Sequence, residues 1–567
     1  MTGTAVICGL KLTHDGAVAV ITDGRLLFST EAEKIANSPR HSGLTDAGQI
    51  LDELRASGVD PAEVTHVAVD GWTPRVDGSS YVRLRGPDGR AHPLAVAGYS
   101  DEPGGAAEPV APVHGDGLPL HPMPGGFASY THSAGHLFAS YCTSPFAERD
   151  RPALVVVWDG GMPPFLYRYD PRGGKLRRVG WVGPASGGLY PIFASHFPPF
   201  RVDRRSPDPD RMFGMEALFP VSGKAMAYAA LGKPDEDAIA VMERVTADLP
   251  PADTHLRMYG WTREVLRRLD GSGLPDATVI SSFQEYLFRV LLAGVRAALR
   301  DAPELAGLPL CLSGGCHLNI TWNAGLRASG LFDEVWVPPF PNDAGSAIGT
   351  ACAEMVRVTG RSAVRWSAFA GPGIRWDGVV PAGWSARPCD IAGLAELLHR
   401  ENEPVVVVSG RAELGPRALG HRSIIAPAVN AAMRDTLNRL KHREGYRPVA
   451  PICLEEHAAE VFAPGTRDPY MLFAHDVRPE WVDRVPAIVH VDGSARLQTV
   501  DPTNSPTYEL LRAYHRLSGV PVLCNTSANH PGKGFFPDPG SAMAWGRTRY
   551  VWSEGILYTR GDTSLCN

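Results

Sequence analysis

Two short segments in the last third of the chain carry residues suited to binding anions. Lys441 and Arg443 lie in KHREGYRPVAP, and Ser527 and Asn529 lie in VLCNTSANHPGKG. Two cations can hold phosphate or carboxylate oxygens, the arginine through its planar fork and the lysine as a point charge. The serine hydroxyl and the asparagine amide can then orient a small planar group by hydrogen bonding. Each tripeptide alone is weak evidence, but together they predict an anion-binding site.

The segment GRAELGPRALGHRSIIA (410–426) is rich in arginine and glycine. Its arginines are Arg411, Arg417 and Arg422. A basic, solvated helix face is the simplest explanation. However, Gly415 and Gly420 interrupt helical periodicity, and apolar residues crowd around the charges, so buried arginines here would need an anionic partner. Arg496, in the strand-like HVDGSARLQTV, is a similar candidate, with a cross-strand ion pair as the alternative.

A third pattern could hold a metal ion. His132 and His136, in YTHSAGHLFASYC, are four residues apart, which places both rings on one face of a helix. Two buried histidines satisfied by their neighbours would explain an isolated pair of this kind. Asp159 at a strand end and Asp343 at a helix start could complete the set, although each could instead close a turn or cap a helix. Two imidazoles and two carboxylates suit a divalent metal such as iron, manganese or zinc.

His14 lies in a tight turn beside Asp15. A surface turn histidine is one explanation. Because the pKa of histidine is close to neutral, His14 is also a candidate general base, or a group that orients a hydroxyl.

The hydrophobic pattern predicts the elements that position these residues. In the first part of the chain, strands are expected at 4–10, 16–22, 25–30, 64–70, 153–158, 165–170, 310–315 and 333–337. Helices are expected at 46–57, 130–142, 222–231, 235–247, 277–301, after 315 through 327, and from 343. Residues 85–125 and 190–215, rich in Pro, Gly and charge, are expected to be long surface loops, the first a candidate lid. A composition change at 360–385 indicates a linker, and a smaller α/β unit with strands at 405–408 and 521–525 follows it.

Length and composition limit the possible functions. A chain of 567 residues exceeds the size of one hydrophobic core and should form more than one domain. A net charge of −6 gives no electrostatic argument for binding nucleic acid or an anionic membrane. The N-terminus lacks the pattern of a signal peptide, and no apolar run is long enough to span a membrane. Nine scattered cysteines without a CxxC motif are typical of a reducing cytoplasm. We therefore expect a cytoplasmic enzyme.

Three glycine-bounded strand ends occur in the first part of the chain: THDG near 14, WDGG near 159 and SGGCHLN near 315. Backbone amides at such turns can bind phosphates, although a DG turn alone mainly indicates a hairpin. Three in this order resemble the two phosphate loops and the adenosine loop of the actin-like ATPase superfamily.

The motifs KxR, SxN, GPRALGHRS, THSAGH, SGGCHLNITWN and PPFPNDAGSAIG occur together in this chain. With them, the chain resembles the O-carbamoyltransferases of the nodulation and antibiotic-tailoring family over nearly its whole length. Several segments, among them DPYMLF (468–473), look most similar to the branch that acts on hydroxymethylcephems. The resemblance implies an α/β fold, with an N-terminal actin-like (ASKHA) domain over 1–365 and a C-terminal YrdC-like domain over 385–567.

The resemblance also implies a reaction in two steps. The YrdC-like domain would make carbamoyl-adenylate from carbamoyl phosphate and ATP with Mg²⁺, using Lys441 and Arg443. The actin-like domain would then transfer the carbamoyl group to a hydroxyl, using His14 and a metal on His132, His136, Asp159 and Asp343, with Fe²⁺ first and Mn²⁺ or Zn²⁺ as alternatives. The implied ligands of carbamoyl phosphate and ATP are Arg411, Arg417, Arg422, Lys441, Arg443, Arg447, Arg496, Asn525, Ser527 and Asn529. Those of a nucleotide in the N-terminal domain are Gly160, Gly161, Lys224, Gly314, Gly315 and Asn319.

Three other functions stay open at this point. One is an actin-like small-molecule kinase, which would leave the YrdC-like residues without a role. Another is a tRNA threonylcarbamoyl-type transferase, which would need a basic surface. The third is a nucleotide-dependent regulatory protein with inactive sites.

The expected partner is a small-molecule hydroxyl acceptor, with a homodimer as an option, and neither nucleic acid nor a membrane is expected. We expect the acceptor to be a primary alcohol on a small polar metabolite. The loop at 195–210 and its Arg-rich continuation to 211 could contact a carboxylate of that acceptor, or could be solvated and paired with their own aspartates.

Overall fold

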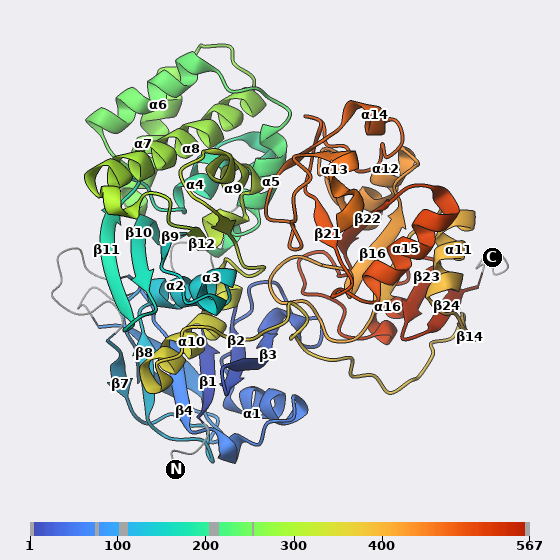
Figure 1. The fold of residues 1–567 in the computed structure, drawn as a ribbon, viewed down its shortest axis with the longest axis horizontal. Coiled ribbons are helices and arrows are strands. Elements are labelled where there is room, and N and C mark those ends of the chain that lie inside the picture. The colour runs from blue at the N-terminus through green and yellow to red at the C-terminus, as the bar shows by residue number, and fades with distance from the viewer. Residues whose placement is uncertain (1–4, 74–78, 101–110, 203–214, 252–253, 562–567) are drawn as a thin grey trace.

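Two sheets in the N-terminal half of the chain repeat one strand order (Figure 1). The structure is a computed structural model that describes residues 5–73, 79–100, 111–202, 215–251 and 254–561. The first sheet has the order β3-β2-β1-β4-β8-β7 and the second has the order β11-β10-β9-β12-β13. In each sheet an antiparallel meander of three strands is followed by two strands parallel to its opening strand. The N-terminal half is therefore a duplicated unit.

The strands of these sheets follow the apolar segments of the sequence. Those of the first sheet are β1 (Val6–Lys11), β2 (Ala17–Thr22), β3 (Arg25–Glu31), β4 (His66–Asp70), β7 (Val113–Gly115) and β8 (Phe127–Tyr130). Those of the second are β9 (Ala153–Asp159), β10 (Met162–Asp170), β11 (Lys175–Trp181), β12 (Leu310–Ser313) and β13 (Val335–Trp336). The chain turns from β2 to β3 at Asp23 and Gly24, whose φ values of 49° and 67° are those that a two-residue hairpin turn requires.

Two central helices join the sheets. Helix α2 (His132–Cys142) packs on β9 and β12, and helix α10 (Ser346–Thr359) packs on β1, β2 and β4. The two helices also pack on each other (Figure 1). A Cβ at Gly349 would lie 1.7 Å from the carbonyl oxygen of Gly135, so only glycine permits this close approach. This contact brings together the helix that carries His132 and His136 and the one that follows Asp343.

A layer of helices covers the other face of the second sheet (Figure 1). They are α4 (Leu189–Ala194), α5 (Val221–Ala229), α6 (Glu236–Asp248), α7 (His255–Leu269), α8 (Asp276–Asp301) and α9 (Ile320–Ala328). Along β9, Leu154 and Val156 pack in this layer, whereas Val155 and Val157 pack in the core that contains α2. The apolar part of β9, from Ala153 to Trp158, is thus buried on both faces. Two shorter helices, α1 (Ala47–Ala56) and α3 (Pro145–Glu148), complete this half.

The C-terminal half is built on one eight-stranded sheet with the order β14-β24-β23-β15-β16-β22-β17-β21. Its strands are β14 (Trp384–Pro388), β15 (Val405–Val408), β16 (Arg422–Pro427), β17 (Ala450–Leu454), β21 (Gln498–Val500), β22 (Val522–Ser527), β23 (Tyr550–Ser553) and β24 (Ile556–Arg560). Its helices are α11 (Ile391–Glu401), α12 (Ala432–Leu440), α13 (Ala458–Val461), α14 (Pro479–Val482), α15 (Thr507–Ser518) and α16 (Pro539–Trp545). A small sheet joins β18 (Phe462–Ala463), β19 (His475–Val477) and β20 (Ser494–Ala495).

The structure confirms the predicted opening meander and most predicted helices, but it corrects two predicted loops. Residues 85–125 contain β6 (Ala91–Ala95), which pairs with β5 (Tyr81–Arg85), and the edge strand β7. The segment 190–215 begins inside α4, because its apolar residues are buried in the helical layer. Residues 101–110 and 203–214 of these segments, with most of the Arg-rich stretch 201–211, lie outside the described residues.

Helix α7 was not predicted. Its apolar residues Met258, Trp261, Val265 and Leu269 recur at helical spacing and are buried, but charged residues separate them. In the part of the chain that the structure describes, no helix combines the length and the apolar character that crossing a membrane would require.

Candidate active sites

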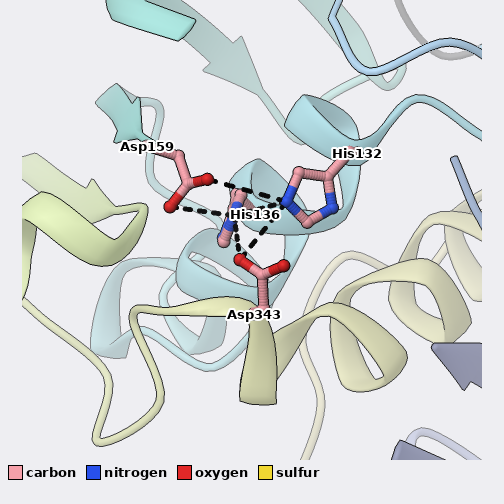
Figure 2. A group of neighbouring side chains, drawn as sticks. All are labelled: His132, His136, Asp159 and Asp343. Atoms are coloured by element: carbon pink, nitrogen blue, oxygen red, sulfur yellow. Dashed lines mark hydrogen bonds and ion pairs between the residues drawn. The ribbon is translucent and has the colours of Figure 1, made fainter. Parts of the chain in front are cut away.

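Two imidazoles and two carboxylates meet where the two sheets of the N-terminal half approach each other (Figure 2). His132 and His136 come from the first turns of α2, which Thr131 caps by accepting from the Ala134 N–H. Asp159 ends β9, and Asp343 begins the short helical turn that leads into α10. All four residues are buried, and their ligand atoms lie within 4.8 Å of one another.

The distances within this group favour a bound cation. The Nε2 atoms of His132 and His136 lie 3.1 Å apart. Asp343 Oδ1 lies 3.4 Å from His132 Nε2 and 3.5 Å from His136 Nε2. Burial alone would raise the pKa of Asp343, but the charges of Lys11, His132 and His14 hold it well below its usual range. Ionised oxygens and imidazole nitrogens that converge at one point suit a divalent metal. The predicted set is therefore assembled, and its donors fit a metal ion.

Further polar groups orient these ligands. Asp70, at the end of β4, accepts from His132 Nδ1 at 2.7 Å, which leaves the Nε2 lone pair directed into the group. Lys11 Nζ lies 2.9 Å from Asp70 Oδ2 and 3.1 Å from Asp343 Oδ2, so it links both carboxylates. The Tyr99 hydroxyl donates to Asp159 Oδ2. Lys11, Asp70 and Tyr99 were not predicted as residues of this site.

Replacing Asp70 by asparagine should weaken metal binding tenfold to about a hundredfold, as is usual when a ligating histidine loses its carboxylate partner. The neutral amide would no longer fix the His132 tautomer or balance the charge of Lys11. Competition with a chromophoric chelator measures the affinity, and the exposed Asp52→Asn is the control. Equal affinity in the Asp70 variant and the wild type would show that Asp70 does not act through His132.

His14 lies beside the metal-ligand group. Its Nδ1 is 3.0 Å from Asp15 Oδ2 and 3.7 Å from Asp343 Oδ2. His41 contacts the same Asp15 carboxylate at 3.0 Å. Burial pushes the pKa of Asp15 up, but hydrogen bonds from His14 and His41 outweigh it and lower the pKa below its usual range. Since the ionised Asp15 can only accept, His14 Nδ1 donates to it, and Nε2 is left as the atom that can accept a proton.

The predicted nucleotide-binding glycines of the N-terminal half lie around Asp159. Gly160 and Gly161 follow it directly in the turn to β10, and the Gly315 N–H donates to Asp159 Oδ1 at 2.6 Å. Gly314 has a φ of 93°, and a Cβ there would lie 2.2 Å from the Trp158 carbonyl oxygen. These glycines thus share one loop region with the metal-ligand group.

Asn319 and Lys224 have protein partners. Asn319 Oδ1 caps α9 by accepting from the N–H groups of Thr321 and Trp322. Lys224 on α5 pairs with Glu444 of the C-terminal half at 3.2 Å. Their part in nucleotide binding stays a prediction.

The two anion-binding tripeptides of the C-terminal half are in contact. Lys441 Nζ donates to the Ser527 carbonyl oxygen at 2.6 Å, to that of Asn529 at 2.8 Å, and to Asn529 Oδ1. The Ser527 hydroxyl also donates to Asn529 Oδ1 at 2.6 Å. Arg443 Nη2 donates to the Thr526 hydroxyl at 2.6 Å. The end of β22 and the turn after α12 are therefore in direct contact, and their role in anion binding stays a prediction.

Among the described residues, cations at this site outnumber the anions that act on them. Burial lowers the pKa of Arg443 to about 9, and the charges of Arg447 and Arg496 add to the effect. Burial and the neighbouring cations Arg443, Arg40 and Arg447 likewise lower the pKa of Lys441 well below its usual range. The buried Nε atoms of Arg417, Arg443 and Arg496 have no hydrogen-bond partner among the described residues. Unfilled donors on crowded, buried cations are the features of a site for a polyanion.

Other predicted ligands of this site are held by the protein itself. Arg422 donates to the carbonyl oxygens of Ser409 at 2.6 Å and Gly410 at 3.0 Å. Arg411 donates to the carbonyl of Ala370 at 3.2 Å. Asn525 Nδ2 donates to the Ala418 carbonyl at 2.8 Å, while its Oδ1 has no partner among the described residues. Arg411 and Arg422 thus fix the loop that carries Arg417.

Two models of known protein families match most of the chain. The family model "Carbamoyltransferase N-terminus" matches residues 6–87 and 123–352, and "Carbamoyltransferase C-terminus" matches 395–551. The N-terminal model leaves residues 88–122 unmatched. This gap lies within the predicted insertion at 85–125 and contains Tyr99.

Named relatives cover nearly the whole chain. Nodulation protein U of Rhizobium tropici is 42% identical, over 98% of this chain and 96% of its own. The 3'-hydroxymethylcephem-O-carbamoyltransferase of Amycolatopsis lactamdurans is 35% identical, over 98% of each chain. The nodulation relatives are thus more similar to this chain than this cephem enzyme. A solved glucokinase from Balamuthia mandrillaris matches with a TM-score of only 0.26 at 10% identity, over 63% of this chain and 94% of its own, which is too low to bear on the fold. By its two matching domains and its full-length relatives, the chain belongs to the carbamoyltransferase family.

Proposed function

We propose that this carbamoyltransferase is an ATP-dependent O-carbamoyltransferase that forms carbamoyl-adenylate in its C-terminal half and transfers the carbamoyl group in its N-terminal half. The observation that carries this proposal is the C-terminal cation cluster, with its unfilled donors on Arg417, Arg443 and Arg496. Carbamoyl phosphate and ATP are both polyanions, and together they would supply the missing negative charge.

In the first step water cleaves carbamoyl phosphate to carbamate and inorganic phosphate. A carbamate oxygen then attacks the α-phosphorus of ATP, and pyrophosphate leaves. Lys441 and Arg443 would neutralise phosphate oxygens, and Ser527 and Asn529 would orient the planar carbamoyl group. AMP is a good leaving group from the carbamoyl-adenylate. Its nucleoside also offers a large binding surface through which the protein can position the carbonyl.

In the second step the acceptor hydroxyl attacks the carbamoyl carbon and AMP leaves. A divalent metal held by His132, His136, Asp159 and Asp343 would stabilise the negative charge that develops near the carbonyl. His14 would take the hydroxyl proton at Nε2, with Asp15 holding the ring. The buried surroundings of the metal-ligand group would exclude water and so limit hydrolysis of the carbamoyl-adenylate, which is a reactive anhydride.

The fold supports the corresponding domain proposals. The duplicated sheet order supports an actin-like N-terminal domain over 1–365. The described chain has no helix between Thr359 at the end of α10 and Trp384 at the start of β14, which supports a boundary before 385 and a separate, YrdC-like domain after it. An actin-like kinase would leave the C-terminal cation cluster unused, and a tRNA-modifying enzyme would need more positive charge than a net charge of −6 offers.

For the acceptor we propose a primary alcohol on a small polar metabolite. One relative's name states that it carbamoylates a hydroxymethylcephem, whereas the name of the more similar nodulation protein states no substrate. The full-length protein, ATP and carbamoyl phosphate should be incubated with small anionic alcohols, cationic aminoglycosides and apolar macrolides. We expect the mass gain of one carbamoyl group on the anionic alcohols, and activity on macrolides alone would refute this choice of acceptor.

Replacing His14 by asparagine should separate the two steps. Asparagine cannot take a proton, so acceptor carbamoylation should fall on the order of a hundredfold or more. Release of AMP and pyrophosphate from ATP and carbamoyl phosphate should persist. The exposed His92→Asn is the matched control. If the folded His14 variant lost both activities equally, His14 would not be the base of the second step.

A further inference from the structure

The segment 31–41 of the N-terminal half is bound firmly to the C-terminal half, and we call it the strap. Near its start, Lys34 Nζ donates to Glu31 Oε1 at 2.7 Å and to the carbonyl oxygens of Glu413 and Gly415. The Gly415 N–H in turn donates to Glu31 Oε1 at 2.7 Å. These bonds attach the strap to the loop that carries Arg417.

Near its end, the strap runs along the turn that holds Lys441. The Arg40 N–H donates to the Gly532 carbonyl oxygen at 2.9 Å, and the Gly534 N–H donates to the Ser38 carbonyl oxygen at 3.0 Å. Asn529, which accepts from Lys441, closes this turn by donating from Nδ2 to the Lys533 carbonyl oxygen at 2.8 Å. A Cβ at Gly534 would lie 1.7 Å from the Glu33 carbonyl oxygen, so the two segments are in direct contact.

The side chain of Arg40 is a cation without a counterion at this position. It is exposed, and no carboxylate among the described residues pairs with it. Its charge acts on Arg417, Lys441, Arg443 and Arg447, where it helps to lower the pKa of each. Placing one more cation beside four others is unfavourable unless an anion binds among them.

We propose that Arg40 is a ligand of the phosphorylated substrate in the C-terminal site, supplied by the N-terminal half through the strap. The identity of the anion rests on the proposed function, whereas the binding of a polyanion there does not. The next residue, His41, contacts Asp15 and so reaches the His14 site. One short segment thus touches both proposed sites, and the C-terminal half alone lacks one cation of its anion site.

Two measurements on the full-length protein test this proposal. The first is the dissociation constant of inorganic pyrophosphate, by titration calorimetry at low salt. The second is the KM for carbamoyl phosphate in pyrophosphate exchange. Arg40→Ala should weaken both on the order of tenfold to a hundredfold, as expected for one lost charge-assisted contact. Arg40→Lys should restore part of the loss. The exposed Arg55→Ala, in the same half, should match the wild type.

The outcomes distinguish this proposal from the proposed function. If wild-type protein shows no exchange but Arg40→Ala still weakens pyrophosphate binding, the proposed function fails and the role of Arg40 stands. If exchange occurs and Arg40→Ala leaves both constants unchanged, the role of Arg40 is refuted. An equal loss in Arg55→Ala would also refute it, because the effect would then be one of total charge.

Discussion

Replacing His136 by alanine should remove bound metal and acceptor carbamoylation together, while leaving carbamoyl-adenylate formation intact. The loss of transfer should exceed about a hundredfold, the upper range seen when only an outer partner of a metal ligand is removed. The reason is geometric: His136 Nε2 lies 3.5 Å from Asp343 Oδ1 and 3.8 Å from Asp159 Oδ1. Among the described residues, the only other imidazole in this group is that of His132. Elemental analysis per chain and transfer assays measure the two effects.

Controls for this variant distinguish loss of the metal site from loss of the folded structure. His136 is fully buried, so the melting temperature should be compared with that of the wild type, and the bulkier His136→Gln should be tested in parallel. The exposed His399→Ala should retain both metal and activity. A His136 variant that keeps the wild-type metal content would show that the four residues are not the ligand set.

Replacing Lys441 by alanine should have the largest effect on the first step. Lys441 is buried, holds three oxygens of Ser527 and Asn529, and would face the phosphates of both substrates. Loss of one charge-assisted contact costs on the order of 1.5–3 kcal/mol, and the loss of the residue that shapes the site should cost more. Carbamoyl-phosphate-dependent pyrophosphate exchange should therefore fall by roughly a hundredfold or more.

The same assay on Ser527→Ala tests the second tripeptide, and the exposed Lys175→Ala serves as the charge control. Metal content should stay at the wild-type level in all three variants, because the metal-ligand group lies in the other half. Wild-type exchange rates in both Lys441→Ala and Ser527→Ala would show that the adenylating site is not at this position.

The sequence predicted the parts of both sites that depend on local spacing. The i, i+4 pair His132 and His136 needs only a helix, and Asp159 needs only the end of a buried strand. Asp70 also ends a buried strand, and Lys11 is a lone cation at the end of an apolar one. Nothing in their local sequence distinguishes them from ordinary turn residues, because their roles depend on how two sheets meet.

The arginines illustrate the same limit in the C-terminal half. Arg411, Arg417 and Arg422 share one glycine-rich segment, and spacing gave no reason to separate them. The path of the loop separates their roles. Arg411 and Arg422 donate to backbone carbonyls, whereas the buried Nε of Arg417 has no partner among the described residues. Arg40 lies in the N-terminal half, far from these arginines in the sequence, so only the three-dimensional contact with the turn at 529–534 reveals it.

The most direct test of the proposed function is the identity of the products that the full-length protein forms from ATP and carbamoyl phosphate. We expect AMP and pyrophosphate, released only when both substrates are present, because the C-terminal cations would bind the two anions together. Chromatography of the nucleotides, with each substrate omitted in turn, gives the answer. Formation of ADP and phosphate, or the same products without carbamoyl phosphate, would contradict carbamoyl-adenylate formation.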